Sequence, residues 1–439
     1  MDTARRLVPA VVVLVLVGAG VVLAAGGPGA LLGGDDTGET EGPVSAAWLS
    51  ETGTSIQGNH HAVAAGRVDG EAVVLVPLGG RAGEDHAHPD GGPTHTHAGD
   101  EGGECALVAL DGAGGERWRS TVSEANCTIH AVADPALADF LGDARPEALA
   151  TSTDDTVTAY DPLTGDVRFE AGLADYGYTR PVVADLTADG QRELLVVDVR
   201  GTVTPLRPDG MAVWTRSFDA YTWGQPVVAD FTADGAPELV AGFDTGRVVL
   251  LDGATGETVW NRSAGGSVTW LTTGDGDADS AIEVYAATSD GRVVAFDGAT
   301  GEREWTRTFD SLAAVRAFGD GDGDGRPELY AVARDARLRA LDASTGETEW
   351  ETTLTDGDVQ MTPPPSMGDV DGDGDAELVA PTNDGVVRIV DPADGSVVAT
   401  YRRDVPVYTY ATLADVDGDG TSEVFVPYGD GRVATLSVG

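Results

Sequence analysis

The sequence predicts an all-β fold in which eight small antiparallel sheets, of four strands each, are arranged in a ring. Three observations lead to this prediction. An aspartate-rich motif recurs at nearly constant intervals, and a motif that ends in an aromatic residue recurs in phase with it. Each repeat also divides into short runs of β-branched and apolar residues separated by Gly and Asp. The chain has 439 residues, and we assign residues 44–439 to the ring.

The two repeated motifs set the period. The aspartate motif begins at seven positions, Asp139 (degenerate), Asp185, Asp230, Asp275, Asp320, Asp369 and Asp415, in steps of 46, 45, 45, 45, 49 and 46 residues. The second motif reads "LDGATGETVW", "FDGATGEREW" and "LDASTGETEW" where it ends at Trp260, Trp305 and Trp350. Weaker copies end at Trp118, Phe169, Trp214 and Tyr401. A fixed period of this length is typical of repeat architectures.

One repeat divides cleanly into strands. The run "RPVVADL" (180–186) is followed by the loop "TADGQ" and by "RELLVVDV" (192–199), and two further runs, "TVTPLRP" and "MAVWTRSF", complete the unit. Four short strands separated by Gly and Asp turns, repeated radially, are typical of a β-propeller blade. No helical periodicity occurs within the repeats, which excludes a helical solenoid.

The number of blades depends on the two ends of the repeat region. Trp48 aligns with the closing strand of the other units, whereas the unit that begins at Asp415 has only three strands. We expect the Trp48 strand to supply the missing fourth strand, because this pairing leaves no open sheet edge. It gives eight blades. A ring of seven is the alternative if the Trp48 strand does not dock.

Both motifs resemble known propeller repeats. "AFDGATGEREW" and its copies resemble the tryptophan-docking repeats of PQQ-like, quinoprotein-type propellers, which have eight blades, and the same repeat occurs in non-enzymatic outer-membrane assembly lipoproteins. The aspartate motif resembles the calcium loops of FG-GAP and VCBS propeller repeats. The resemblance covers roughly residues 44–439 and implies the eight-bladed fold. It does not settle function.

The aspartate loops are candidate calcium sites. Ca²⁺ takes six to eight oxygen ligands, often from alternate carboxylates of a tight loop. In "DVDGDGTSEV" the acids occupy positions 1, 3, 5 and 9, whereas an EF-hand places its glutamate at position 12 between helices. We predict structural Ca²⁺ sites in loops between first and second strands; acidic turns without an ion are the alternative.

The loops differ in completeness. Thr187 and Thr232 replace the second acid in two of them, Ser280 replaces the glycine in another, and Leu141 interrupts the first, where we expect no ion. The candidate ligands are Asp320, Asp322, Asp324 and Glu328; Asp369, Asp371, Asp373 and Glu377; Asp415, Asp417, Asp419 and Glu423; and Asp275, Asp277, Asp279 and Glu283.

The histidines map to the opposite face. An insertion at residues 81–104 follows the second strand of its unit and carries His86, His88, His95 and His97, and the others are His60, His61 and His130, which begin innermost strands on the same face. Paired H-x-H motifs suggest a Zn²⁺ or Cu²⁺ site, and a solvated loop of biased composition is the alternative. We expect Cys105 and Cys127 to form a disulfide there, which fits an oxidising compartment; two free buried thiols are the alternative.

Aromatic residues gather at the same strand entries, where they could bind a peptide, a glycan or a small ligand. Packing between blades is the alternative. These residues are Tyr176, Tyr178, Tyr221, Trp223, Trp270, Tyr408 and Tyr410.

The N-terminus indicates export. Residues 7–25 are uncharged and almost wholly apolar, behind Arg5 and Arg6. Within segment 1–25 they could form a transmembrane helix with the propeller outside the cytoplasm; a cleaved signal peptide and a secreted protein are the alternative. Residues 26–43 read as a flexible, acidic linker.

Charge excludes some partners. The formal net charge is −46, which repels nucleic acid and anionic membrane. Every basic residue is Arg, a composition that resembles proteins of salt-accumulating haloarchaea. We expect a monomer.

These observations favour a non-catalytic function. The PQQ-like resemblance allows a PQQ-dependent oxidoreductase, but the adjacent cysteines of those enzymes are absent, the chain is short for that family, and no "GxSxG" nucleophile elbow occurs. We therefore predict a membrane-anchored, calcium-stabilised scaffold that binds a protein, peptide or glycan partner, without PQQ. A transition-metal-binding surface protein is a further alternative.

Overall fold

The computed structural model describes residues 38–53, 59–80, 105–277 and 281–439, all within one compact unit, Thr37–Gly439. The predicted membrane segment (1–25), most of the predicted linker and the insertion (81–104) lie outside the described residues. Within the described ranges, no helix has the length and apolar character needed to cross a membrane.

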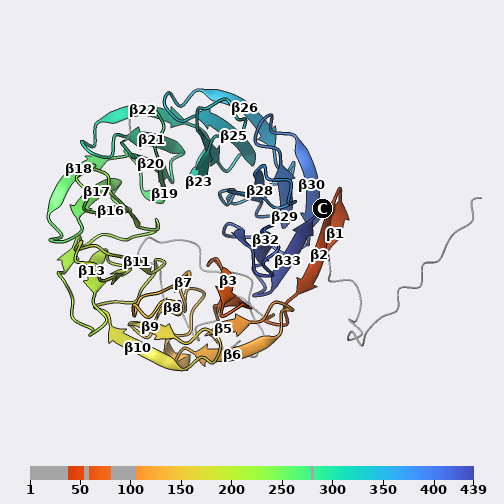
Figure 1. Cartoon of the computed structure of the whole chain (residues 1–439). Coiled ribbons are helices and arrows are strands. Elements are labelled where there is room, and N and C mark those ends of the chain that lie inside the picture. Colours follow the sequence, from red (N-terminus) through yellow and green to blue (C-terminus); the bar gives the residue numbers. More distant parts are fainter. Residues whose placement is uncertain (1–37, 54–58, 81–104, 278–280) are drawn as a thin grey trace, which may run out of the picture. The chain divides into compact units, whose positions relative to one another are not determined.

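The described unit is a ring of eight antiparallel sheets (Figure 1). The first strand of each blade lies nearest the centre and the last lies at the rim. The prediction of an all-β, eight-bladed propeller is therefore confirmed, and the seven-bladed alternative is wrong.

The first four blades follow one another along the chain, with a short 3₁₀ helix, η1 (Glu124–Asn126), between the first two. Blade 1 consists of β3 (Ala64–Val68), β4 (Glu71–Leu78), β5 (Ala106–Leu110) and β6 (Glu116–Thr121). Blade 2 consists of β7 (Ala136–Ala138), β8 (Glu147–Ser152), β9 (Thr156–Tyr160) and β10 (Val167–Gly172). Blade 3 consists of β11 (Val182–Ala184), β12 (Glu193–Val197), β13 (Thr202–Leu206) and β14 (Arg216–Ser217). Blade 4 consists of β15 (Val227–Ala229), β16 (Glu238–Gly242), β17 (Arg247–Asp252) and β18 (Thr258–Ser263).

The last four blades include both strands from the N-terminal side of the unit. Blade 5 consists of β19 (Val268–Gly274), β20 (Glu283–Thr288), β21 (Arg292–Phe296) and β22 (Arg303–Thr308). Blade 6 consists of β23 (Ala314–Gly319), β24 (Glu328–Val332), β25 (Arg337–Asp342) and β26 (Thr348–Thr353). Blade 7 consists of β27 (Ser366–Gly368), β28 (Glu377–Pro381), β29 (Val386–Val390), β30 (Val397–Arg402) and β1 (Glu39–Glu41). Blade 8 consists of β31 (Thr412–Ala414), β32 (Glu423–Pro427), β33 (Val433–Val438) and β2 (Val44–Leu49).

Blade 8 closes the ring as the sequence predicts. Strand β2 pairs antiparallel with β33, with Val44 opposite Val438 and Trp48 opposite Thr435. The first described segment therefore completes the last sheet, and Figure 1 shows the two strands side by side at the rim.

The end of the predicted linker is part of the fold. Glu39–Glu41 forms β1, which pairs with β30 and gives blade 7 a fifth strand at its outer edge. Ordered structure thus begins before residue 44, where we expected the propeller to start. The acidic sequence "ETE" gave no strand signal, because its side chains are exposed and only its backbone is needed for pairing.

The core consists of the middle strands. Strands such as β12 and β24 are buried at every residue, because each sheet is covered on both faces by its neighbours. The result is a series of apolar clusters between adjacent blades rather than one central core.

Tryptophans of the second motif join neighbouring blades. Trp260, at the rim of blade 4, packs against Phe296 of blade 5, and its indole Nε1 donates to the carbonyl of Gly298 at 2.6 Å. Trp48 makes the same bond from blade 8 to Gly112 of blade 1, at 3.0 Å, so the contact continues across the closure. The other equivalent bonds run from Trp118 to Pro162, Trp214 to Gly253, Trp305 to Ala343 and Trp350 to Pro392.

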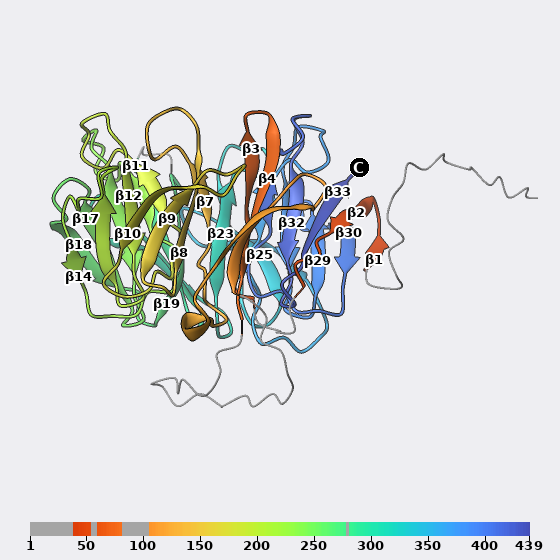
Figure 2. The same ribbon diagram turned by 90° about the horizontal axis from the view of Figure 1, so that it is seen from below.

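The strands run across the thickness of the ring and so define two faces (Figure 2). The acidic loops, which connect first to second strands, lie on one face, here called the acid-loop face. The loops that lead into the innermost strands lie on the other, called the entry face, and His60, His61 and His130 belong to them.

Candidate functional site

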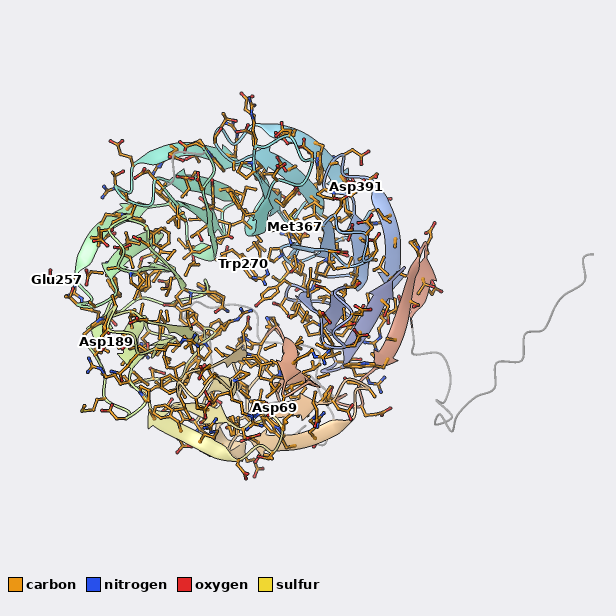
Figure 3. The ribbon with its side chains drawn as sticks, in the orientation of Figure 1. Asp69, Asp189, Glu257, Trp270, Met367 and Asp391 are labelled. Atoms are coloured by element: carbon orange, nitrogen blue, oxygen red, sulfur yellow. A yellow bond between two sulfur atoms is a disulfide. The ribbon has the colours of Figure 1, made fainter. Side chains whose placement is uncertain are left out.

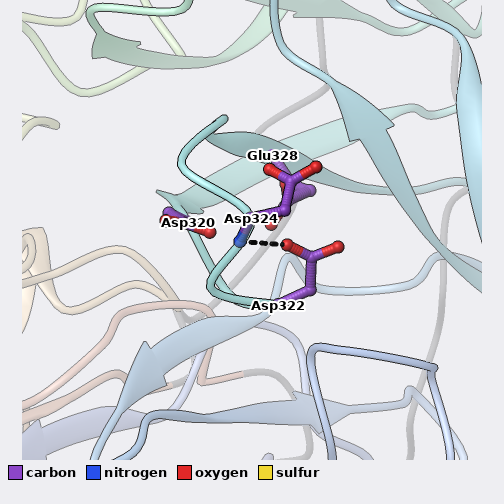
Figure 4. A group of neighbouring side chains, drawn as sticks. All are labelled: Asp320, Asp322, Asp324 and Glu328. Carbon is purple, nitrogen blue, oxygen red and sulfur yellow. Dashed lines mark hydrogen bonds between the residues drawn. The ribbon is translucent and has the colours of Figure 1, made fainter.

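The loop between β23 and β24 brings four predicted calcium ligands together (Figure 4). One carboxylate oxygen from each of Asp320, Asp322, Asp324 and Glu328 lies within 4.8 Å of the others. The loop forms because its own backbone satisfies these acids: Gly323 and Gly325 donate to the two oxygens of Asp320 at 2.9 and 3.0 Å. Both glycines have positive φ, 73° and 88°, a conformation that favours glycine.

Glu328 carries the strongest electrostatic effect in this loop. Glu328 is the first residue of β24, and its side chain is buried. Its carboxylate accepts hydrogen bonds from the Gly321 amide at 2.8 Å and from the Tyr330 hydroxyl at 3.1 Å. Burial raises the pKa of Glu328 to about 7, and the nearby acids Glu349 and Asp322 add to the effect. Four close carboxylates without a cation are therefore unfavourable, and their oxygens are the ligands that Ca²⁺ prefers.

Each of the other predicted loops brings three of its described acids together. The groups within the same 4.8 Å limit are Asp275, Asp277 and Glu283; Asp369, Asp371 and Glu377; and Asp415, Asp417 and Glu423. Asp373 and Asp419 stay out of their groups, and each accepts a backbone hydrogen bond from two residues ahead, at 2.9 and 2.8 Å. Asp279 lies outside the described residues.

A fifth group of acids lies in a loop that we expected to bind Ca²⁺ more weakly. Asp230, Asp234 and Glu238 lie within the same limit of one another although Thr232 replaces the second acid. The Thr232 hydroxyl donates to Glu238 at 2.8 Å. The signal that could have identified this group is that the acids at positions 1, 5 and 9 remain.

The first loop, where we expect no ion, contains an arginine. The Arg168 guanidinium, from the outer strand β10, donates through Nη1 to Glu147 at 2.5 Å and through Nη2 to Asp143 at 2.7 Å. Both acids occupy the positions that hold Glu328 and Asp324 in the complete loop. A side-chain cation therefore neutralises the one loop whose acid pattern is interrupted by Leu141.

On the entry face, histidines and aromatic residues form one continuous cluster. His60 stacks on Tyr408 with ring centroids 4.4 Å apart, and it contacts His130 edge-on at 5.2 Å. His130 and His61 both contact Tyr178. Tyr178 also contacts Tyr221 and Trp223, with ring centroids 5.8 and 6.0 Å apart. Trp270 contacts Tyr410, with ring centroids 6.0 Å apart.

The members of this cluster differ in exposure. Tyr178 and Tyr410 are buried. Trp223 is 43% exposed, which leaves a large aromatic surface on the entry face. Tyr176, Tyr221, Tyr408 and Trp270 are partly buried. The cluster is thus a packed base with an exposed tryptophan.

A buried carboxylate organises the base of the cluster. Asp134, which precedes β7, accepts hydrogen bonds from His61 Nδ1 at 2.9 Å, from the Ala62 amide at 3.0 Å and from the Tyr410 hydroxyl at 3.0 Å. Burial alone would raise the pKa of Asp134, but these bonds and the nearby charge of Arg180 hold it below its usual range. The other ring nitrogen of His61, Nε2, lies 3.2 Å from His130 Nδ1 and shares a hydrogen bond with it.

The described imidazoles do not make a three-ligand metal site as they stand. No group with three ligand atoms within 4.8 Å includes His60, His61 or His130 among the described residues. Burial, and secondly the charge of His61, lowers the pKa of His60 to about 4, so its imidazole is neutral near pH 7. His86, His88, His95 and His97 lie outside the described residues, so the Zn²⁺ or Cu²⁺ site stays a prediction.

The predicted disulfide is confirmed. Cys105 and Cys127 are bonded, with Cα atoms 5.4 Å apart. Gly80, at the other end of the insertion, donates to the carbonyl of Thr128 at 2.9 Å. Both described flanks of the insertion are therefore fixed close to His130.

Sequence reasoning missed three polar members of the central network. Arg180 donates to the Tyr410 hydroxyl at 2.6 Å, Gln225 donates to Asp134 at 3.2 Å, and Arg316 stacks over the Tyr410 ring at 3.8 Å. A signal for Arg180 and Gln225 exists, because they stand five residues before the first aspartate of a loop, as Asp134, Trp270 and Tyr410 also do. Arg316 stands one position later in its repeat.

The fold and these two faces define an eight-bladed, tryptophan-docked β-propeller with acidic loops. The family model described as "Outer membrane protein assembly factor BamB" matches residues 103–321 and 323–419. The chain belongs to this family.

Solved structures agree at the level of the fold. The chain is similar to BamB from Moraxella catarrhalis, with 17% identity and a TM-score of 0.57 over 89% of this chain and 100% of that one. The computationally designed Ika8 protein has 14% identity and a TM-score of 0.60, over 88% and 99%. BBS1N, solved in complex with ARL6DN, has 14% identity and a TM-score of 0.51, over 70% and 91%. No curated protein matches the chain.

Proposed function

We propose that this protein is a non-catalytic scaffold outside the cytoplasm, held by its N-terminal segment and stiffened by Ca²⁺, which binds a partner protein through its entry face. The observation that carries the proposal is the exposed indole of Trp223 on a rigid base of buried aromatic and histidine side chains. Tryptophan is enriched among the residues that dominate binding energy in protein interfaces. A preorganised base also lowers the entropy lost on binding.

A second exposed apolar side chain supports the same face. Leu312 is 36% exposed and lies in the loop that leads into β23, as Trp223 lies in the loop that leads into β15. On a chain with a net charge of −46, such apolar positions are where a partner can dock without meeting the dominant negative charge.

The comparisons support partner binding as the use of this fold. The family is described as an assembly factor. BBS1N, a distant structural relative, was solved in complex with another protein, ARL6DN.

Calcium is proposed for the acid-loop face. The residues that would hold it in the best site are Asp320, Asp322, Asp324 and Glu328, whose oxygens already converge. A bound ion would neutralise the crowded carboxylates and fix the hairpin between the two innermost strands of the blade. Its role is structural, because the loop lies opposite the proposed docking face.

The location rests on two features. Residues 7–25 are long enough and apolar enough to act as an anchor, with an arginine pair before them. The Cys105–Cys127 disulfide is typical of proteins in an oxidising compartment.

The test compares two variants of equal exposure. Trp223→Ala removes the entry-face indole, and Val259→Ala removes a side chain on β18 that is also 43% exposed. The full-length proteins are crosslinked in membranes and their covalent partners identified. We expect one partner with wild type and Val259→Ala that is lost with Trp223→Ala. The same partners in all three samples, no partner at all, or a PQQ-dependent oxidation by the purified protein would contradict the proposal.

A further inference from the structure

The centre of the ring contains a partly open cavity of about 480 Å³. Innermost strands from five blades line it: β3, β7, β23, β27 and β31. Most of the residues that line it have apolar side chains, Ala65, Ala136, Phe318 and Met367 among them, but polar atoms supply the larger part of its surface. Figure 3 labels Met367 at the inner edge of the ring, across the centre from blade 3.

Two arginines are the charged side chains of this wall. Arg180 and Arg316 enter it from blades 3 and 6, and every other residue that lines it is uncharged. Arg316 uses Nε for a long hydrogen bond to the Ser366 hydroxyl, at 3.4 Å, and rests on the Tyr410 ring. Arg180 uses one Nη2 bond to the Tyr410 hydroxyl. A positively charged interior is the reverse of the acidic surface around it.

Both guanidinium groups keep donors without a partner in the described part of the chain. Nε of Arg180 is buried and makes no hydrogen bond there. Nη1 of Arg180 and both Nη atoms of Arg316 donate to no described residue either, although they are not fully buried. Neither arginine forms an ion pair with any of the described carboxylates.

The nearest acid is already engaged. Asp134 accepts hydrogen bonds from His61, Ala62, Tyr410 and Gln225. Its interaction with the two arginines is therefore electrostatic, without a direct hydrogen bond. Two positive charges thus face one negative charge. Burial, and the repulsion from Arg180, lower the pKa of Arg316, which is the direction expected for a cation that lacks a counterion.

A partly buried charge with unused donors loses part of its hydration, and an anion that pairs with it offsets that loss. Guanidinium groups fit carboxylate and phosphate oxygens better than any other partner, since two parallel N–H donors match two oxygens. We infer that the central cavity binds a small anion with a carboxylate or phosphate group, held between Arg180 and Arg316. The volume suits a compact metabolite-sized ligand.

Titration calorimetry of the full-length protein tests this inference. Inorganic phosphate and succinate are the two probes, at constant ionic strength and pH 7. We expect saturable binding of at least one probe with one site per chain, and the stronger probe distinguishes a phosphate ligand from a carboxylate ligand. Absence of saturable binding for both would overturn the inference.

Three variants locate the site. Arg316→Gln should weaken binding about tenfold or more, since a hydrogen bond to a charged group contributes about 1.5–3 kcal/mol. Ala136→Leu keeps both arginines and fills the cavity, and should weaken binding as well; it covers the case in which Arg316→Gln does not fold. Arg216→Gln changes an exposed arginine on β14 and should bind as wild type. Wild-type affinity in both cavity variants would place the anion elsewhere and overturn the inference.

Discussion

The Arg168 guanidinium donates to Glu147 at 2.5 Å, so the first acidic loop contains its own counterion. In the described part of the chain, no ion pair joins an arginine to Asp320, Asp322, Asp324 or Glu328, which occupy the corresponding loop of blade 6. The two loops have related backbones: Asp143 and Asp324 each accept a hydrogen bond from the amide two residues ahead, at 3.1 and 2.8 Å. Among the described residues, an arginine supplies positive charge to the first loop but not to the loop of blade 6. The two loops can therefore be compared as a matched pair.

The first prediction uses this pair. Asp324→Asn should remove about one bound Ca²⁺ per chain and lower the calcium-dependent gain in melting temperature, because it removes one ligand charge from a converged site. Calcium content after equilibrium dialysis and melting curves with and without chelator, at constant ionic strength, provide the measurement. Asp143→Asn should leave the calcium content unchanged. Equal calcium content in Asp324→Asn and wild type would remove Asp324 from the site.

The second prediction concerns the blade-to-blade contact of Trp260. Trp260→Ala should lower the free energy of unfolding by about 3–5 kcal/mol, because it empties a buried aromatic site and leaves the Gly298 carbonyl without its donor. Urea denaturation gives the difference. Val259→Ala, at the neighbouring exposed position, should change stability by less than about 0.5 kcal/mol. Similar values for the two variants would show that the tryptophan contact contributes little.

The third prediction concerns ring closure. Removal of residues 1–37 leaves β1 and β2 in place, and this truncated protein should keep wild-type cooperative unfolding. Removal of residues 1–49 deletes both strands and exposes the edges of β33 and β30, so this protein should lose stability and associate through those edges. Light scattering and thermal unfolding compare the two. A monomeric, stable 50–439 fragment would mean that the closure is dispensable.

The fourth prediction is a pH dependence. Burial lowers the pKa of His60 to about 4 from an ordinary value of 6.5. Between these values the unfolded chain binds a proton that the folded chain does not, so stability is lost as the pH falls through this window. Above pH 6.5 the contribution is complete, and below pH 4 it no longer changes. The loss is at most about 3 kcal/mol.

The measurement for His60 is a difference between two proteins, because other acids titrate in the same range. Wild type and His60→Gln are unfolded with urea from pH 7.5 to 4, and the difference in unfolding free energy should shrink or reverse as the pH falls. A difference that stays constant across the window would mean that His60 titrates normally in the folded protein.

Sequence alone predicted the features that repeat. The strand number per unit, the docking tryptophans and the converging acids of the Asp320 loop each recur in register, so their meaning comes from the pattern rather than from one residue. The Trp48 strand could be assigned because the final unit lacked one strand. The disulfide followed from two cysteines placed at one face by the same register.

The central network could not be predicted in the same way. Five of its members occupy one repeat position but differ in chemistry: Asp134, Arg180, Gln225, Trp270 and Tyr410. In the sequence, each of these residues is indistinguishable from a chance variation at that position. Their relationship appears only in the closed ring, where positions from distant blades are in contact. Tyr410 and Asp134, for example, are 276 residues apart.

Strand β1 and the contact of Arg168 with the first acidic loop were not predicted from the sequence, for related reasons. The residues of β1 are exposed acids, so no side-chain pattern marks that strand. Arg168 lies on the outer strand of blade 2, 21 residues beyond Glu147, and no repeated motif links the two positions. Sequence spacing specifies which residues share a blade more directly than it specifies which side chains meet.

The pairing of β2 with β33 has a consequence for synthesis. The partner of a strand near residue 44 is made only after almost the whole chain has left the ribosome, so blade 8 stays incomplete until residues 433–438 emerge. Contacts of such long sequence separation slow folding, and an open sheet edge is a target for aggregation during that delay. A chain of this topology therefore closes its ring only at the end of synthesis, after the strands of the other seven blades have been made.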